Sequence, residues 1–171
     1  MRLEVGQPAP LIKVQDSFGK PVDFAELVGQ GKRILLWFYP KANSGGCTAQ
    51  GKYYADLHPA FRDRGVEVFG VSADPASSQC AFIDKLSTEG AMLPDADHSI
   101  GKAFGVSGWM GFGLMLGMYS RDTILIGSDG RVEQIWRNVN PFTDAKTVLA
   151  YLEAKPEAYG AEPSKLKVGG V

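Results

Sequence analysis

The feature that most restricts the fold of this chain is an uninterrupted apolar run at residues 34–39, ILLWFY, which ends at Pro40. A strand without polar alternation is typical of the centre of a sheet that is covered on both faces. A second run at residues 67–72, EVFGVS, predicts another buried strand. Both runs are followed by helical patterns, so we expect a layered α/β domain.

The order of the remaining elements refines this prediction. Asp23 is expected to cap a short helix, and Asp129-Gly130 is typical of a tight turn between two strands. We expect further strands at residues 11–15, 91–93, 123–128 and 131–137. Helices are expected at residues 24–28, from 47 onward, at 74–89, at 98–104 and at 144–154. Pro59 should kink the second of these helices, and Asp74 should cap the third. Alternating strands and helices favour parallel strands, and the last hairpin adds an antiparallel edge. The prediction is a thioredoxin-like α/β fold with a mixed central sheet flanked by helices.

Length and charge narrow the classes of function. With 171 residues, the chain suits one domain at residues 1–155, followed by a C-terminal extension at 156–171 that we expect to be extended or mobile. Eighteen basic against nineteen acidic residues give a formal net charge of −1 without a basic stripe, so nucleic-acid binding is not expected. We expect no signal peptide, no stable membrane insertion and a cytoplasmic location.

The metal-binding residue types are sparse and scattered. Cys47 and Cys80 lie 33 positions apart, and His58 and His98 are isolated. Structural zinc sites use closely paired ligands, so we expect neither a metal nor another cofactor.

Cys47 stands at a position that favours a reactive thiol. It follows a buried strand and a glycine-containing loop, where a helix is expected to begin. Unpaired amides and the positive end of the helix dipole stabilise an anion there, and the thiolate is the nucleophilic form of cysteine. A buried cysteine with a purely structural role remains the alternative reading.

The residues before Cys47 form a recognisable motif. Pro40, Ser44 and Cys47 fit the pattern P-x-x-x-[TS]-x-x-C directly after the apolar strand. This pattern resembles the signature of the peroxiredoxins, and FYPKANSGGCT is similar to their bacterioferritin-comigratory, or Q-type, branch. The resemblance covers residues 3–153 and includes VSAD, LPDADHSIGKAFGV and the Asp129-Gly130 hairpin.

The resemblance implies a thiol-dependent peroxidase with Cys47 as the attacking residue. Ser44 would contact the thiolate and the peroxide, Pro40 would wall the pocket, and Arg121, at the head of the strand before the hairpin, would stabilise the leaving oxygen. Gln50 would orient that arginine. Without the resemblance, Arg121 reads as a surface arginine at a strand end.

The same resemblance implies how the oxidised enzyme is reset. The common Q-type resolving cysteine would fall at Lys52, but some members carry it in the helix that here contains Cys80. Cys80 would then form an intramolecular disulfide with Cys47, with thioredoxin as reductant. Cysteines on two separate helices are expected to need local unfolding around Cys47, Cys80 or both, and Gly45, Gly46 and Gly51 should ease it at the first turn of the Cys47 helix. An incidental Cys80 with an external resolving thiol is the alternative. Gly45 stands where the family commonly has proline.

The expected partners are hydrogen peroxide or an alkyl hydroperoxide and a thiol reductant, acting on a monomer or homodimer. The uncharged segment 107–120 could be a dimer contact or packed loop, an apolar wall for organic hydroperoxides, or a weak membrane-surface contact. A thiol-disulfide oxidoreductase is disfavoured because the chain has no Cys-x-x-Cys. A non-enzymatic thioredoxin-like binding module is the remaining alternative.

Overall fold

The computed structural model describes residues 3–42, 44–106 and 119–155, and its core is a five-stranded mixed sheet. The strand order is β5-β4-β3-β6-β7, with β5 Ala91–Pro94, β4 Val66–Ser72, β3 Arg33–Phe38, β6 Thr123–Ile126 and β7 Val132–Trp136. Strands β3, β4 and β5 are parallel, whereas β6 and β7 run antiparallel. The predicted fold class is confirmed.

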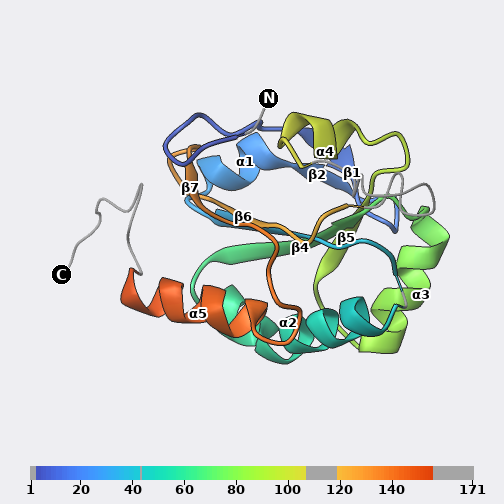
Figure 1. The fold of residues 1–171 in the computed structure, drawn as a ribbon. Helices are drawn as coiled ribbons and strands as arrows, with labels where there is room; N and C mark the ends of the chain where they lie inside the picture. Colours follow the sequence, from blue (N-terminus) through green and yellow to red (C-terminus); the bar gives the residue numbers. More distant parts are fainter. Residues whose placement is uncertain (1–2, 43, 107–118, 156–171) are drawn as a thin grey trace.

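Helices cover both faces of this sheet (Figure 1). The helices α2 Gly45–Asp63, α3 Ala76–Leu86 and α5 Asp144–Ala154 contribute to the core on one face. The short helices α1 Phe24–Gly29 and α4 Ser99–Ala103 lie on the other face, together with the hairpin of β1 Lys13–Gln15 and β2 Pro21–Asp23. This three-layer arrangement leaves the central strands no face open to water.

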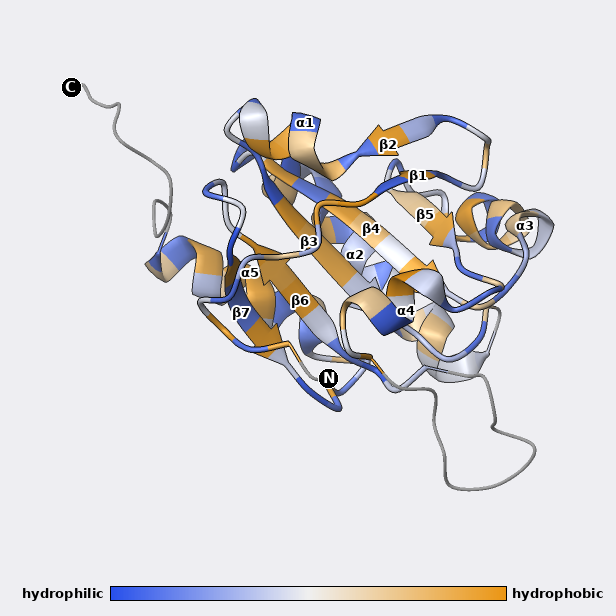
Figure 2. Ribbon diagram, turned by 90° about the horizontal axis from the view of Figure 1, so that it is seen from above, coloured by the Kyte–Doolittle hydropathy of each residue, from blue (hydrophilic) through white to orange (hydrophobic). Residues whose placement is uncertain are grey.

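The central strand β3 shows why its sequence is apolar throughout. Side chains alternate between the faces of a strand, so Leu35 and Trp37 enter the core under α2 while Ile34, Leu36 and Phe38 enter the opposite core. All six residues of β3 are buried. Figure 2 shows the resulting hydrophobic colouring along β3 and β6.

Several predicted boundaries differ from the structure. Strand β2 was not predicted, because Pro-Val-Asp carries no strand pattern, and α2 begins at Gly45 instead of Cys47 and continues through Pro59. The cap predicted at Asp74 is wrong: Pro75 occupies the N-cap position of α3 without a side-chain hydrogen bond. Asp23, by contrast, caps α1 through the backbone amides of Ala25 and Glu26, as predicted.

The segment 107–118 and the extension 156–171 lie outside the described residues, so the predictions made for them stay open. Within the described part of the chain, no helix combines the length and apolar character needed to cross a membrane. In the same part, no group of three or more His, Cys, Asp or Glu side chains is arranged to hold a metal ion.

Candidate active site

Cys47 is the third residue of α2 and is fully buried. The helix starts there because Ser44 caps it: the Ser44 hydroxyl accepts a hydrogen bond from the Cys47 amide (3.4 Å), and its carbonyl accepts one from the Thr48 amide (2.8 Å). The first turn therefore holds the thiol at the positive end of a 19-residue helix, next to the end of β3.

The Ser44 hydroxyl donates to the backbone carbonyl of Lys41 (3.0 Å). Its observed partners are thus backbone groups of the loop and of the helix start. Contact with the sulfur or with a peroxide, as expected from the sequence, requires rotation of this hydroxyl. Pro40 lies half-buried between β3 and this loop.

Arg121 brings a positive charge to the thiol across 74 positions of sequence. Its Nη1 atom lies 3.2 Å from Cys47 Sγ, and the same atom donates to Gln50 Oε1 at 2.8 Å. The pairing of β3 with β6 explains this meeting, since the Phe38 amide donates to the Asp122 carbonyl (2.8 Å) and so sets Arg121 beside the end of β3. The structure thus brings Ser44, Gln50 and Arg121 together around Cys47.

Gln50 is anchored on its other side by a buried acid. Its Nε2 atom donates to Asp144 Oδ2 (3.0 Å), which also accepts hydrogen bonds from Tyr54 (2.6 Å) and Thr123 (2.8 Å). Burial raises the pKa of Asp144, while these hydrogen bonds and the charge of Arg121 oppose the rise. Burial and the neighbouring Asp144 also raise the pKa of Tyr54 well above its ordinary value.

The loop before Cys47 is held by Asp74. Asp74 Oδ2 accepts hydrogen bonds from the Ala42 amide (2.7 Å) and from the Ser72 hydroxyl (2.8 Å). The carboxylate thus points toward the loop and away from the start of α3, which explains why it does not cap that helix. It ties the loop that precedes Cys47 to the segment that precedes the Cys80 helix.

Cys80 lies apart from this cluster. It is half-buried on α3, and its Sγ atom lies 3.1 Å from the backbone carbonyl oxygen of Ser17. Both cysteines are free thiols. The structure therefore does not pair the two sulfurs, in keeping with the expectation that a bond between them needs local unfolding.

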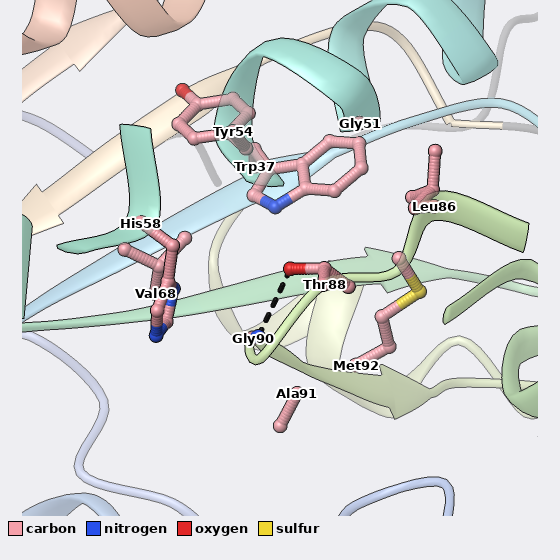
Figure 3. A pocket seen from close by; sticks show the side chains of 10 residues that line it. All are labelled: Trp37, Gly51, Tyr54, His58, Val68, Leu86, Thr88, Gly90, Ala91 and Met92. Atoms are coloured by element: carbon pink, nitrogen blue, oxygen red, sulfur yellow. Dashed lines mark hydrogen bonds between the residues drawn. The ribbon is translucent and has the colours of Figure 1, made fainter. Parts of the chain in front are cut away.

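A small cavity lies one helical turn beyond Cys47, between α2, the sheet and the end of α3 (Figure 3). Gly51 lies in its wall, where a Cβ atom would lie 2.5 Å from Leu86 Cδ1. Gly51 thus allows the two helices to approach. The cavity is lined by Trp37, Gly51, Tyr54, His58, Val68, Leu86, Thr88, Gly90, Ala91 and Met92. Cys47 and Arg121 are not among them, so this cavity is separate from the thiol.

Sequence reasoning missed the roles of Asp74, Asp144, Tyr54 and Thr123. Gln50 and Tyr54 are four residues apart, so they share one face of α2, and this spacing of two polar groups was the available signal for a common buried partner. Asp144 carried no such signal, because it reads as an ordinary acidic residue in the first turn of a helix.

Known proteins are similar to this chain over most of its length. The model of the AhpC/TSA family matches residues 5–135. Peroxiredoxin Bcp of Escherichia coli K12 is 32% identical over 152 residues, which cover 88% of this chain and 96% of that protein. The chain belongs to the peroxiredoxins. Peroxiredoxin Bcp of Bacillus subtilis is likewise 32% identical, over 81% of this chain and 88% of that protein.

Solved structures place this peroxiredoxin in the same branch. PrxQ of Xylella fastidiosa superimposes with a TM-score of 0.84 at 27% identity, covering 92% of this chain and 99% of that one. The bacterioferritin comigratory protein of Xanthomonas campestris, studied for its alkyl peroxide reduction, gives a TM-score of 0.79 at 26% identity over 90% and 100% of the two chains. The resemblance to the Bcp/Q-type branch is confirmed, and with it the function of a thiol-dependent peroxidase.

Proposed function

We propose that Cys47 is the peroxidatic residue of this peroxidase and that Arg121 is its main electrostatic partner. The observation that carries the proposal is the 3.2 Å contact between Arg121 Nη1 and the sulfur of a fully buried thiol at a helix start. Arginine keeps its charge in a dry pocket and offers several donors in a fixed fork, so it stabilises negative charge on the sulfur and on the peroxide.

The chemical step is a two-electron oxidation of the sulfur. The Cys47 thiolate attacks one peroxide oxygen, an S–O bond forms and the O–O bond breaks. The departing oxygen, as hydroxide or alkoxide, takes up a proton and leaves as water or an alcohol. Cys47 remains as a sulfenic acid. Arg121 favours this step because its donors face the region where the negative charge moves from sulfur to the leaving oxygen.

The substrate class includes hydrogen peroxide and organic hydroperoxides. The alkyl peroxide reduction reported for the Xanthomonas campestris relative supports the second class. In this proposal Pro40 shields the side of Cys47 where the peroxide binds, Ser44 contributes its hydroxyl after release from Lys41, and Gln50 holds Arg121.

Cys80 completes the cycle as the resolving residue. Its thiol attacks the Cys47 sulfenic acid, an S–S bond forms and water leaves, and thioredoxin or a similar dithiol reduces the disulfide. The cycle suits the cytoplasm, where thiol reductants keep cysteines reduced. The half-buried position of Cys80 and its contact with a single backbone carbonyl support a thiol that becomes available when α3 or the first turn of α2 opens.

The experiment mixes pre-reduced enzyme with hydrogen peroxide and monitors a single turnover by stopped-flow fluorescence. Cys47→Ser should abolish the reaction, whereas Cys80→Ser, which removes the other thiol, should react once at the wild-type rate. A Cys47→Ser variant that keeps more than about a tenth of wild-type turnover with a full reducing system would refute the assignment, since losing the nucleophile of an enzyme removes most of its rate.

A further inference from the structure

A buried carboxylate behind Arg121 has no part in the steps described above. Asp144, the first residue of α5, is 2% exposed. Its Oδ2 atom collects the hydrogen bonds from Gln50, Tyr54 and Thr123, whereas its Oδ1 atom has no hydrogen-bond partner among the described residues. Burying a carboxylate is unfavourable, and leaving one of its oxygens unpaired adds to that cost. A carboxylate at this position thus lowers the stability of the fold. Packing alone does not explain why an aspartate stands there.

The chemistry of the partners determines the orientation of Gln50. A guanidinium only donates hydrogen bonds, and an ionised carboxylate only accepts them. Between Arg121 and Asp144, the Gln50 amide therefore has one arrangement that satisfies both ends: Oε1 toward Arg121 (2.8 Å) and Nε2 toward Asp144 (3.0 Å). Gln50 is fully buried, so water cannot readily replace either partner.

The chain of contacts ends at the thiol. Arg121 Nη1 contacts both Gln50 Oε1 and Cys47 Sγ. A displacement of the Gln50 side chain therefore displaces the Arg121 nitrogen that faces the sulfur. Asp144 is itself held by two other elements, through Tyr54 on α2 and Thr123 on β6. The acid, carried by α5, is thus a support fixed by hydrogen bonds from two other elements, α2 and β6.

We propose that Asp144 is a positioning residue for the peroxidase reaction: it holds the Gln50 amide so that Gln50 in turn holds Arg121 against Cys47. This inference rests on the proposed roles of Arg121 and Cys47. Asp144 does not touch the substrate. It acts by keeping the long side chain of Arg121 in the geometry that the transfer of oxygen requires.

The test is a double-mutant cycle on the peroxide step, measured by stopped flow on pre-reduced enzyme so that resolution and reductant do not contribute. Asp144→Ala should lower the second-order rate constant about tenfold or more, the scale of a small misplacement of a catalytic group. In an Arg121→Ala background the same change should lower the rate less than twofold, because the group it positions is already gone.

Two further variants separate positioning from simple loss of stability. Asp144→Asn keeps an acceptor oxygen for Gln50 and should restore at least half of the wild-type rate. Glu133→Gln is the matched control: Glu133 is an equally buried acid, paired with Arg33 and Tyr151 away from Cys47, and this variant should react like wild type despite its lower stability. If Asp144→Ala does not fold, Asp144→Leu fills the space without accepting a hydrogen bond and should show the same loss.

The outcomes are distinct. A rate unchanged in Asp144→Ala, or lowered equally with and without Arg121, overturns the inference while leaving the proposed function intact. An Asn variant as slow as the Ala variant also overturns it. If Arg121→Ala alone reacts at the wild-type rate, the proposed role of Arg121 fails, and the positioning role of Asp144 fails with it.

Discussion

Gly46 lies directly against the guanidinium of Arg121: a Cβ atom at this position would lie 3.1 Å from Arg121 Nη2 and 3.7 Å from Pro141 Cγ. That distance to Nη2 is tighter than ordinary van der Waals contact. The glycine before Cys47 therefore leaves the space in which the arginine approaches the sulfur.

Gly46→Ala should displace Arg121 by a few tenths of an ångström and slow the peroxide step by about threefold to tenfold, since small misplacements of catalytic groups cost rate steeply. Gly45→Ala is the control, because a Cβ atom there meets nothing within 4 Å. Gly45→Ala should raise stability by up to about 1 kcal/mol, because it replaces a glycine in the first turn of α2 without a close contact. In Gly46→Ala the close contact with Arg121 should offset this gain. Stopped-flow rates and urea unfolding check the two effects separately. Equal rates in the two variants contradict the steric argument.

Arg121→Ala should slow the reaction of reduced enzyme with hydrogen peroxide by about 10²-fold or more, the usual loss for one preorganised donor. Arg121→Lys should recover only part of this, because an ammonium group keeps the charge but loses the planar guanidinium whose Nη1 atom contacts both Cys47 and Gln50. Arg131→Ala changes an exposed arginine between β6 and β7, serves as the control and should react like wild type. A wild-type rate in Arg121→Ala would remove the arginine from the mechanism.

One equivalent of peroxide should convert the wild-type enzyme into a monomer with a Cys47–Cys80 disulfide, detected as a linked peptide by mass spectrometry. Because the sulfurs have separate partners in the reduced structure, Cys80 with Ser17 and Cys47 with Arg121, bond formation should follow the peroxide step as a slower, separate phase. Cys80→Ser should consume the first equivalent and then stall as sulfenic or over-oxidised Cys47 when thioredoxin is the sole reductant.

Two results would count against Cys80 as the intramolecular resolver. One is normal turnover of Cys80→Ser with thioredoxin, and the other is a wild-type product that consists only of disulfide-linked dimers. The enzyme would then use a one-cysteine or an intersubunit mechanism.

The buried Asp144 should leave a signature in the pH dependence of stability. Its pKa is raised in the folded protein, whereas an unfolded aspartate has a pKa of about 3.9, so in the interval between the two values the folded state binds more protons. The contribution of this group to the free energy of unfolding is therefore fully present below about pH 3.9 and is lost as the pH rises through the folded pKa. Relative to Asp144→Asn, the wild type should lose stability with rising pH in this window, as measured by urea unfolding at a series of pH values. A difference that stays constant or grows with pH would contradict a raised pKa.

The candidate site was predictable wherever its signals lie close together in sequence. The run of residues 34–39, the spacing from Pro40 through Ser44 to Cys47, and the start of a helix near Cys47 are all contained within a short stretch of chain. Patterns of burial and helix capping act over a few residues, so they can be recognised without knowing what packs against them.

Asp74 illustrates where such reasoning failed. An aspartate before a proline is typical of a helix start, but its carboxylate accepts the hydrogen bond of the Ala42 amide, 32 positions earlier in the chain. The Ala42 amide and the Ser72 hydroxyl thus compete with the first amides of α3 for this carboxylate. The order of β3 and β4 in the sheet decides this competition, because it places the two loops side by side.

By itself, the sequence determined the alternation of strands and helices, the buried central strand and the thiol at the start of α2. Only the tertiary structure decided that Arg121 reaches this thiol, that Asp144 supports Gln50 and that Cys80 contacts Ser17 instead of Cys47. The reason is physical: periodicity and capping depend on neighbours along the chain, whereas these contacts depend on the order and register of the strands. The antiparallel pairing of Trp37 with Thr123, for example, sets Arg121 beside the end of β3.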